Sequence, residues 1–278
     1  REDAIKKGLE FFGPKMKEMI LFVEDKMKVF NSSNKTILVH CWRGGMRSAG
    51  VAWLLDLYGF KVYTLVGGYK AYRNWVLKML ESKPALKILG GYTGSGKTIV
   101  LDALKEMNKA VIDLEDLAGH RGSAFGNIGL PKQPSQEMFE NKLALALHAV
   151  SGEDAIWLED ESRRIGDINM PHEFWSTMRR SPLFFLDIPF EARLDNITKG
   201  YGIFRQEDLV NATMRIRKRL GGLNAKNAIN YIIEGNTKEA FRILLAYYDK
   251  FYAHGLHDRE QLNELLKTVP CNGVDIKT

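Results

Sequence analysis

Gly91-Tyr-Thr-Gly-Ser-Gly-Lys-Thr98 is the stretch that decides the fold, because it fits the pattern G-x-x-x-x-G-K-[ST]. An apolar run, Leu86 to Leu89, precedes it, and a helix-compatible run follows it. Such a loop directs backbone N–H groups and a helix N-terminus at phosphate oxygens. Its candidate phosphate-binding residues are Gly91, Thr93, Gly94, Ser95, Gly96, Lys97 and Thr98. Lys97 adds a positive charge, and the Thr98 hydroxyl is a candidate Mg²⁺ ligand. The motif indicates diphosphate binding, not nucleotide hydrolysis.

The sequence around this loop predicts an α/β sheet flanked by helices. Strands are expected at Leu86 to Leu89, Ala110 to Ile112, Ala155 to Leu158 and Leu183 to Leu186. After Pro189 the pattern is helical to near the end of the chain. One of these helices, Glu207 to Leu220, has an apolar face opposite a basic one. We therefore expect a P-loop domain with a helical C-terminal part.

Three consecutive carboxylates, Glu159, Asp160 and Glu161, follow the expected strand that ends at Leu158. In P-loop proteins a carboxylate at the end of a second strand approaches the metal or the attacking group. The spacing does not choose among the three. An ordinary ion pair with Arg163 or Arg164 is the alternative for each of them.

The first part of the chain shows a second β-α-β-α alternation, which favours a parallel sheet. We expect a helix at Glu2 to Phe30, a break at Asn31 to Asn34, strands at Thr36 to His40 and Lys61 to Leu65, and helices at Ala49 to Tyr58 and Tyr69 to Leu80. Glu81 to Ala85 then interrupts the pattern with a proline. The expected domains are therefore residues 1–82 and 83–278.

His40-Cys-Trp-Arg-Gly-Gly-Met-Arg-Ser48 places Cys41 between the first of these strands and a helix. The glycines allow a tight ring of inward N–H groups, and two arginines and a helix N-terminus lower the pKa of a thiol. Cys41 is therefore a candidate nucleophile, in a site formed with Arg43, Gly44, Gly45 and Arg47. Rhodanese-type sulfurtransferases and cysteine-dependent phosphatases both use such a loop, and its length does not separate them. Cys271 has no comparable setting.

Composition narrows the class of protein. No uncharged apolar run approaches the roughly 20 residues of a membrane-spanning helix. The chain has 2 cysteines and no metal-ligand spacing, which argues against a structural disulfide or zinc site. A net charge of +6 suits a polyanionic partner without requiring one. We expect a cytoplasmic protein with no membrane partner.

Together, Cys-Trp-Arg-Gly-Gly-Met-Arg-Ser at 41–48, Val-Gly-Gly-Tyr-Lys-Ala-Tyr-Arg at 66–73 and the P-loop resemble the tRNA 2-selenouridine synthase family. The likeness continues through Asp113 to Gly126, Gln133 to Gln136, Glu159 to Gly166 and Lys218 to Gly222. It implies a partial rhodanese-like parallel α/β domain followed by a P-loop NTPase-like α/β domain. It also implies replacement of sulfur by selenium in wobble 2-thiouridine of tRNA, with selenophosphate and geranyl diphosphate as co-substrates and an S-geranylated intermediate.

The resemblance assigns the selenium carrier to Cys41 and the geranyl donor's diphosphate to the P-loop. A candidate second site comprises Asp113, His120, Arg121, Glu159, Asp160, Glu161, Ser162 and Arg163. Candidate tRNA contacts are Arg164, Arg215, Lys218 and Arg219. The family has a further rhodanese half ahead of the first helix, so we expect a second protein chain to supply it, or a truncated product. Two other functions stay open: a P-loop kinase or ATPase with an accessory rhodanese-like module, and a non-catalytic tRNA-binding subunit.

Overall fold

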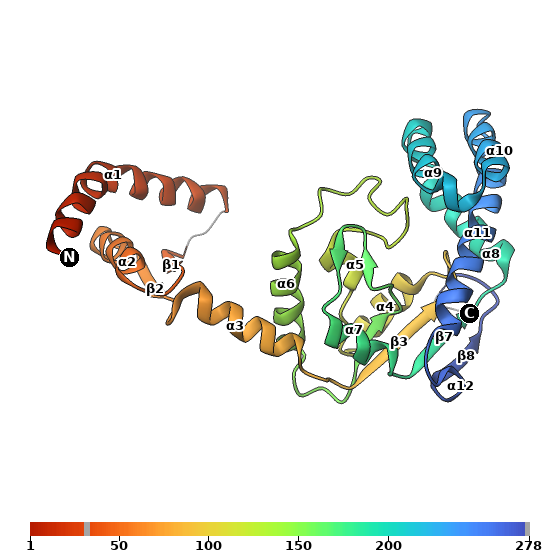
Figure 1. Ribbon diagram of the computed structural model, residues 1–278, viewed down its shortest axis with the longest axis horizontal. Helices are drawn as coiled ribbons and strands as arrows, with labels where there is room; N and C mark the ends of the chain where they lie inside the picture. The colour runs from red at the N-terminus through yellow and green to blue at the C-terminus, as the bar shows by residue number, and fades with distance from the viewer. Residues whose placement is uncertain (31–33, 276–278) are drawn as a thin grey trace. The chain divides into compact units, whose positions relative to one another are not determined.

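The computed structural model describes residues 1–30 and 34–275, so the break expected at Asn31 to Asn34 lies outside the described residues except for Asn34. The chain divides into two compact units, Arg1–Trp75 and Val76–Thr278. Figure 1 labels most of the elements of both. Among the described residues no helix is long and apolar enough to cross a membrane.

The first unit is a small parallel α/β arrangement. Its elements are α1 (Glu2–Val29), β1 (Thr36–Val39), α2 (Met46–Tyr58), β2 (Lys61–Thr64) and most of α3 (Gly68–Leu80). Strands β1 and β2 pair in parallel, from Thr36 opposite Lys61 to Val39 opposite Thr64. The expected β-α-β-α order and parallel pairing are confirmed. Helix α2 begins at Met46 rather than Ala49, inside the cysteine loop.

The apolar surface of this unit is only partly covered. Leu54, Leu55 and Phe60 are buried around α2, but no side chain of α1 is fully buried. Leu38 on β1 is 60% exposed and Val66 is 90% exposed. Such exposure is what a two-stranded sheet leaves when few layers cover it.

The second unit holds a parallel sheet with strand order β4-β3-β7-β8. Its strands are β3 (Leu86–Gly91), β4 (Ile156–Glu159), β7 (Leu183–Asp187) and β8 (Leu266–Pro270), with a short antiparallel pair, β5 (Arg164–Ile165) and β6 (Ile168–Asn169). The helices are α4 (Lys97–Glu106), α5 (Leu114–Ala118), α6 (Gln136–Ala149), α7 (His172–Arg179), α8 (Phe190–Tyr201), α9 (Gln206–Leu220), α10 (Gly222–Ile233), α11 (Thr237–His257) and α12 (Leu262–Leu265). The strand-loop-helix setting of the P-loop is confirmed.

Two sequence-based expectations for this unit were incomplete. Ala110 to Ile112 forms only a single bridge, between Val111 and Trp157. The reason is local: the side chain of Asp113 accepts a hydrogen bond from the Asp116 N–H at 2.8 Å and starts α5 at once. The second miss is β8, an edge strand that periodicity did not reveal because it is mostly exposed.

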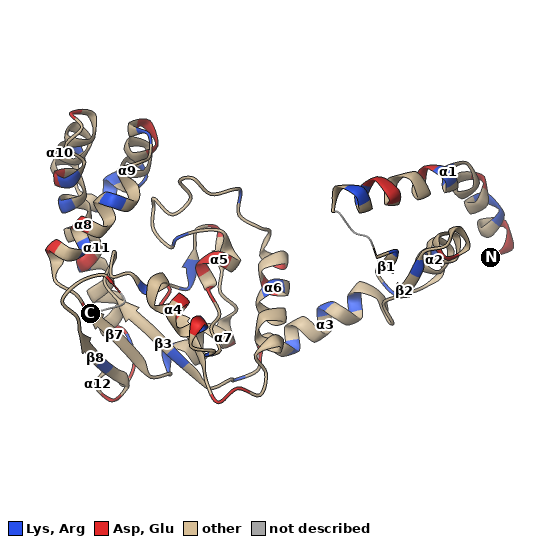
Figure 2. Ribbon diagram, turned by 180° about the vertical axis from the view of Figure 1, so that it is seen from behind, with Lys and Arg blue, Asp and Glu red and all other residues tan. Residues whose placement is uncertain are grey.

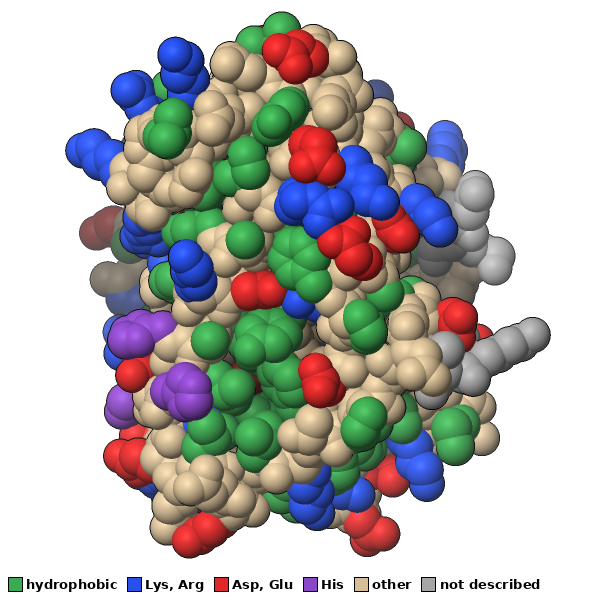
Figure 3. Space-filling view, turned by 90° about the vertical axis from the view of Figure 1, so that its right-hand side faces the viewer, with side chains coloured by type: hydrophobic (Ala, Val, Ile, Leu, Met, Phe, Trp, Pro, Cys, Tyr) green, Lys and Arg blue, Asp and Glu red, His purple; other side chains and the backbone are tan. Residues whose placement is uncertain are grey.

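The C-terminal helices share their own apolar core. Leu209, Ile216, Leu244 and Leu245 are buried in it, and α9 turns its apolar face inward as expected. Figure 1 shows α8 to α11 grouped beside the sheet. On the face seen in Figure 3, hydrophobic side chains gather at the centre among charged ones.

Candidate functional site

Cys41 lies immediately after β1, and the first turn of α2 closes a ring around its sulfur. The Gly45 N–H donates to Sγ at 3.3 Å, and the Ser48 hydroxyl lies 3.2 Å from Sγ. Hydrogen bonds from Ser48 and from the backbone at Arg43, Gly45 and Ser48 lower the pKa of Cys41 from 9.0 to about 6. At neutral pH the sulfur is therefore mostly thiolate, the reactive form.

The source of this activation is only partly the one expected, because backbone N–H groups lower the pKa of Cys41 but the arginine charges do not. The side chains of Arg43 and Arg47 are exposed, and hydrogen bonds rather than their charges account for the lowered pKa of Cys41. Ser48 is 4% exposed and makes the largest contribution to the lowered pKa, although it was not among the residues predicted for this site. Its position seven residues after the cysteine, in the first turn of α2, is the signal that could have identified it.

The start of α3 fixes the outside of the cysteine loop. The N–H groups of Tyr69 and Lys70 donate to the carbonyls of Cys41 and Trp42, both at 2.9 Å. A Cβ on Gly68 would lie 2.3 Å from the Gly44 nitrogen, so only glycine permits this approach. Because the carbonyls are held outward, the loop can turn N–H groups toward the sulfur.

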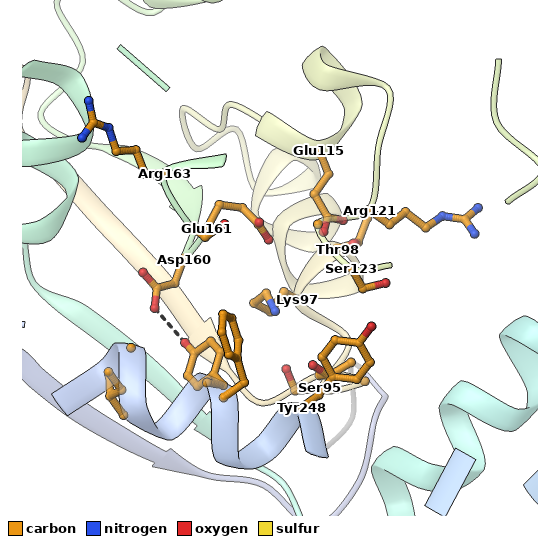
Figure 4. Close-up of a pocket in the computed structure, with 18 of the residues that line it drawn as sticks. Ser95, Lys97, Thr98, Glu115, Arg121, Ser123, Asp160, Glu161, Arg163 and Tyr248 are labelled. Carbon is orange, nitrogen blue, oxygen red and sulfur yellow. Dashed lines mark hydrogen bonds between the residues drawn. The ribbon is translucent and has the colours of Figure 1, made fainter. Parts of the chain in front are cut away.

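The P-loop lines a cavity of about 780 Å³ in the second unit, shown in Figure 4. Gly94 and Gly96 have positive φ, and Gly96 precedes α4 directly. Lys97 Nζ donates to the Gly91 carbonyl at 3.4 Å. Ser95 Oγ is buried and has no hydrogen-bond partner among the described residues. A buried hydroxyl without a partner in a ring of backbone donors fits an anionic ligand.

The three consecutive carboxylates have three different environments. Glu159 is 2% exposed and accepts a hydrogen bond from the Glu115 N–H at 2.7 Å. Burial, with the nearby charge of Asp113 next in effect, raises the pKa of Glu159 to about 8. Asp160 accepts from Arg259 at 2.6 Å and from the Tyr252 hydroxyl at 2.7 Å. Neither Arg163 nor Arg164 supplies this ion pair.

Like Asp160, Glu161 contributes to the wall of the cavity. It lines the wall together with Lys97 and Glu115, and Figure 4 shows these side chains converging. Burial, followed by the charge of Glu115, raises the pKa of Glu161 well above its ordinary value. A Cβ on Gly122 would lie 2.8 Å from a Glu161 oxygen and 3.1 Å from a Glu115 oxygen. Glycine at 122 thus leaves room for both carboxyl groups.

The other members of the candidate second site divide into two groups. Arg121, Ser162 and Arg163 line the cavity with the P-loop. Asp113 instead caps α5, and His120 is 8% exposed, with a pKa lowered chiefly by burial. Glu115 belongs to the cavity although sequence analysis did not select it. Its place in the acidic first turn after Asp113 was the available signal.

The candidate tRNA contacts also differ from one another. Lys218 and Arg219 are exposed in the last turn of α9, whose basic residues are blue in Figure 2. Arg215 donates to the Ala124 carbonyl at 2.7 Å and so holds a loop of the fold. Arg164 pairs with Asp167 at 3.1 Å on the surface.

The lining of the cavity is also rich in apolar and aromatic side chains. The residues that provide it are Trp175, Ile197, Tyr201, Tyr248, Phe251, Tyr252 and Leu256. A cavity lined by both backbone donors and aromatic rings suits a ligand that carries a phosphate group on an apolar body. Nucleoside and prenyl bodies both meet that description.

Comparisons with known proteins match both units. Residues 84–267 match the tRNA 2-selenouridine synthase AAA domain, and residues 9–74 match the rhodanese-like domain. A tRNA 2-selenouridine synthase of Bdellovibrio bacteriovorus is 34% identical, over 93% of this chain and 78% of the relative. The synthase of Shewanella denitrificans is 33% identical, over 94% and 78%, and that of Pseudomonas syringae pv. syringae 34%, over 81% and 69%.

These relatives align with both units in a single chain, so the expected second protein chain is not supported. The matches extend through the cysteine loop and the P-loop and cover most of the sequence. The chain therefore belongs to the tRNA 2-selenouridine synthase family.

Proposed function

We propose that this enzyme converts 2-thiouridine at the wobble position of tRNA into 2-selenouridine. The reaction uses geranyl diphosphate and selenophosphate, passes through an S-geranylated uridine, and employs Cys41 as the selenium carrier. The observation that carries the proposal is the presence of an activated thiol and a P-loop cavity in one member of this family.

The cysteine loop supports the selenium-transfer half of the proposal. A thiolate held by backbone N–H groups is a nucleophile at neutral pH, and the same donors stabilise an anion bound beside it. Gly44 and Gly45 provide the turn, and Arg43 and Arg47 are exposed cations beside it. Selenophosphate is a small anion, so its negative charge is complementary to these cations and N–H donors.

The cavity of the second unit supports the geranyl-transfer half. Backbone donors of the P-loop and Lys97 suit the diphosphate, while rings such as Tyr248 and Phe251 suit an isoprenoid chain. The hydroxyl of Thr98 and the carboxyl of Glu161 are oxygen donors of the kind that Mg²⁺ prefers, so the residues present fit that ion. Bound there, Mg²⁺ would supply charge neutralisation of the diphosphate.

The tRNA assignment rests on surface charge as well as on the family. Lys218 and Arg219 are exposed cations without acidic neighbours in the same helical turn. Contacts of this kind bind phosphates with a steep dependence on salt. Arg164 contributes less, because Asp167 already pairs with it.

The test is mass spectrometry of wobble nucleosides after incubation with 2-thiouridine tRNA, geranyl diphosphate and selenophosphate. We expect 2-selenouridine from the wild type, its loss in Cys41→Ser, and loss of both modified products in Lys97→Ala. Cys271→Ser is the matched control and should retain activity, because burial raises the pKa of Cys271. Unchanged 2-thiouridine under all conditions, together with ATP turnover that ignores Cys41→Ser, would establish a nucleotide-dependent activity instead.

A further inference from the structure

Trp42, which directly follows the candidate nucleophile, is a large aromatic residue with an exposed side chain. Its side chain is 51% exposed, although its backbone is fixed by the Lys70 N–H, which donates to the Trp42 carbonyl at 2.9 Å. A large aromatic ring on an immobile backbone is a platform that loses little conformational freedom when a flat ligand covers it.

Four more rings continue from Trp42 and support it. Tyr69 contacts both Trp42 and His40, each with ring centroids 5.8 Å apart. Tyr72 lies 5.8 Å from Tyr69, and Trp75 stacks on Tyr72 at 5.6 Å with an interplanar angle of 29°. We call these five residues the aromatic ladder. Tyr69, Tyr72 and Trp75 are half-buried, whereas His40 and Trp42 are exposed at the other end of the ladder.

The charge around the ladder favours a polyanion. From Thr36 to Leu80 the sequence has one acidic residue, Asp56. The basic residues of the same segment are Arg43, Arg47, Lys61, Lys70, Arg73 and Lys78. Exposed aromatic rings among cations are how proteins bind single-stranded nucleic acid, because each base has a face that stacks and each nucleotide has a phosphate.

From this arrangement the geometry points to Trp42 as a stacking platform for an unpaired nucleobase of the tRNA substrate, beside Cys41. This inference rests on the proposed function, since it takes tRNA as the substrate. It adds a binding residue that holds the nucleotide next to the thiol, with Tyr69 as its support. The ladder is thus a positioning device, and it takes no part in bond making.

The test uses an RNA stem-loop with 2-thiouridine in the loop and the fluorescent base 2-aminopurine next to it. Wild type should quench the 2-aminopurine on binding, and Trp42→Ala should weaken binding about 5- to 150-fold and abolish that quenching. Trp42→Phe should retain most of the affinity. Trp53→Ala is the matched control, because Trp53 on α2 is similarly exposed, at 57%, and does not belong to the ladder.

Two further measurements separate stacking from damage to the loop. The pH midpoint of Cys41 alkylation should be the same in wild type and Trp42→Ala, and the salt dependence of binding should keep its slope, since no phosphate contact is removed. If the midpoint moves, the RNA affinities of Trp42→Leu and Trp42→Phe are compared instead. Both side chains are apolar, but only Phe presents a ring on which a base can stack. Equal affinity of these two variants would overturn the inference.

An RNA with abasic sites around the thiouridine completes a double-mutant cycle. Removing the bases should weaken wild-type binding, and Trp42→Ala should then add no further loss. Additive losses would overturn the inference while leaving the proposed function intact. Failure of the wild type to bind or convert any 2-thiouridine RNA would overturn both.

Discussion

Replacing Ser48 by alanine should separate the activation of Cys41 from the shape of its loop. With a pKa of about 6, roughly 90% of Cys41 is thiolate at pH 7, against about 1% at the ordinary value of 9.0. The Ser48 hydroxyl, 3.2 Å from Sγ, makes the largest contribution to this difference. The backbone N–H groups remain in the variant, so the pKa of Cys41 should rise only part of the way, by about one pH unit.

The assay is the rate of iodoacetamide alkylation against pH in a Cys271→Ser background, where Cys41 is the remaining thiol. At pH 6 the Ser48→Ala rate should fall roughly three- to tenfold, because fewer molecules carry a thiolate. Above pH 9 both proteins are fully ionised, and the variant should be equal or slightly faster, since nucleophilicity rises with thiol pKa. The two rate profiles should therefore cross.

Two results would refute this reasoning. An unchanged midpoint in Ser48→Ala would mean that the backbone alone activates the sulfur. A loss of rate that is equal at every pH would mean that the variant displaces the loop rather than changing the thiol. Ser82→Ala is the control, because the Ser82 hydroxyl donates to the Met79 carbonyl and should leave the profile unchanged.

Three other predictions follow from the second unit. Lys97→Ala should weaken binding of inorganic diphosphate at least tenfold by calorimetry, because the P-loop loses the ammonium group that pairs with a phosphate; equal affinity would contradict the site. Asp160→Ala should lower the free energy of unfolding by about 3–5 kcal/mol in urea titrations, because Arg259 is left buried without its partner. Asp167→Ala is the control: it removes an exposed ion pair and should change the free energy of unfolding by less than about 0.5 kcal/mol. Lys218→Ala should reduce the salt slope of tRNA binding by about one without changing sequence preference; an unchanged slope would remove it from the interface.

The features that were predictable from sequence are those with local causes. Helical periodicity located α1 and α9 within one residue at each end, because spacing alone sets which side chains share a face. The P-loop was recognisable because its glycines and lysine act within eight consecutive residues. The cysteine loop was recognisable for the same reason. The strand β8 was missed, since it lies at the edge of the described sheet beside β7 and carries little apolar pattern.

The choice among Glu159, Asp160 and Glu161 shows where local reasoning ends. All three lie in consecutive positions at the end of the same strand, so spacing does not distinguish them. The residue that donates a hydrogen bond to Asp160 is Arg259, 99 residues further along the chain. Tyr252, which also bonds Asp160, accepts a hydrogen bond from the Gly91 N–H at 3.3 Å. Asp160 is therefore tied to the start of the P-loop through α11, and it is suited to position that loop rather than to react. Asp160 and Glu161 both line the cavity, and what separates them is their partners: Tyr252 and Arg259 hold the carboxylate of Asp160, whereas Glu161 shares a hydrogen bond with Glu115. Those partners are far away in the sequence, so local spacing does not reveal them.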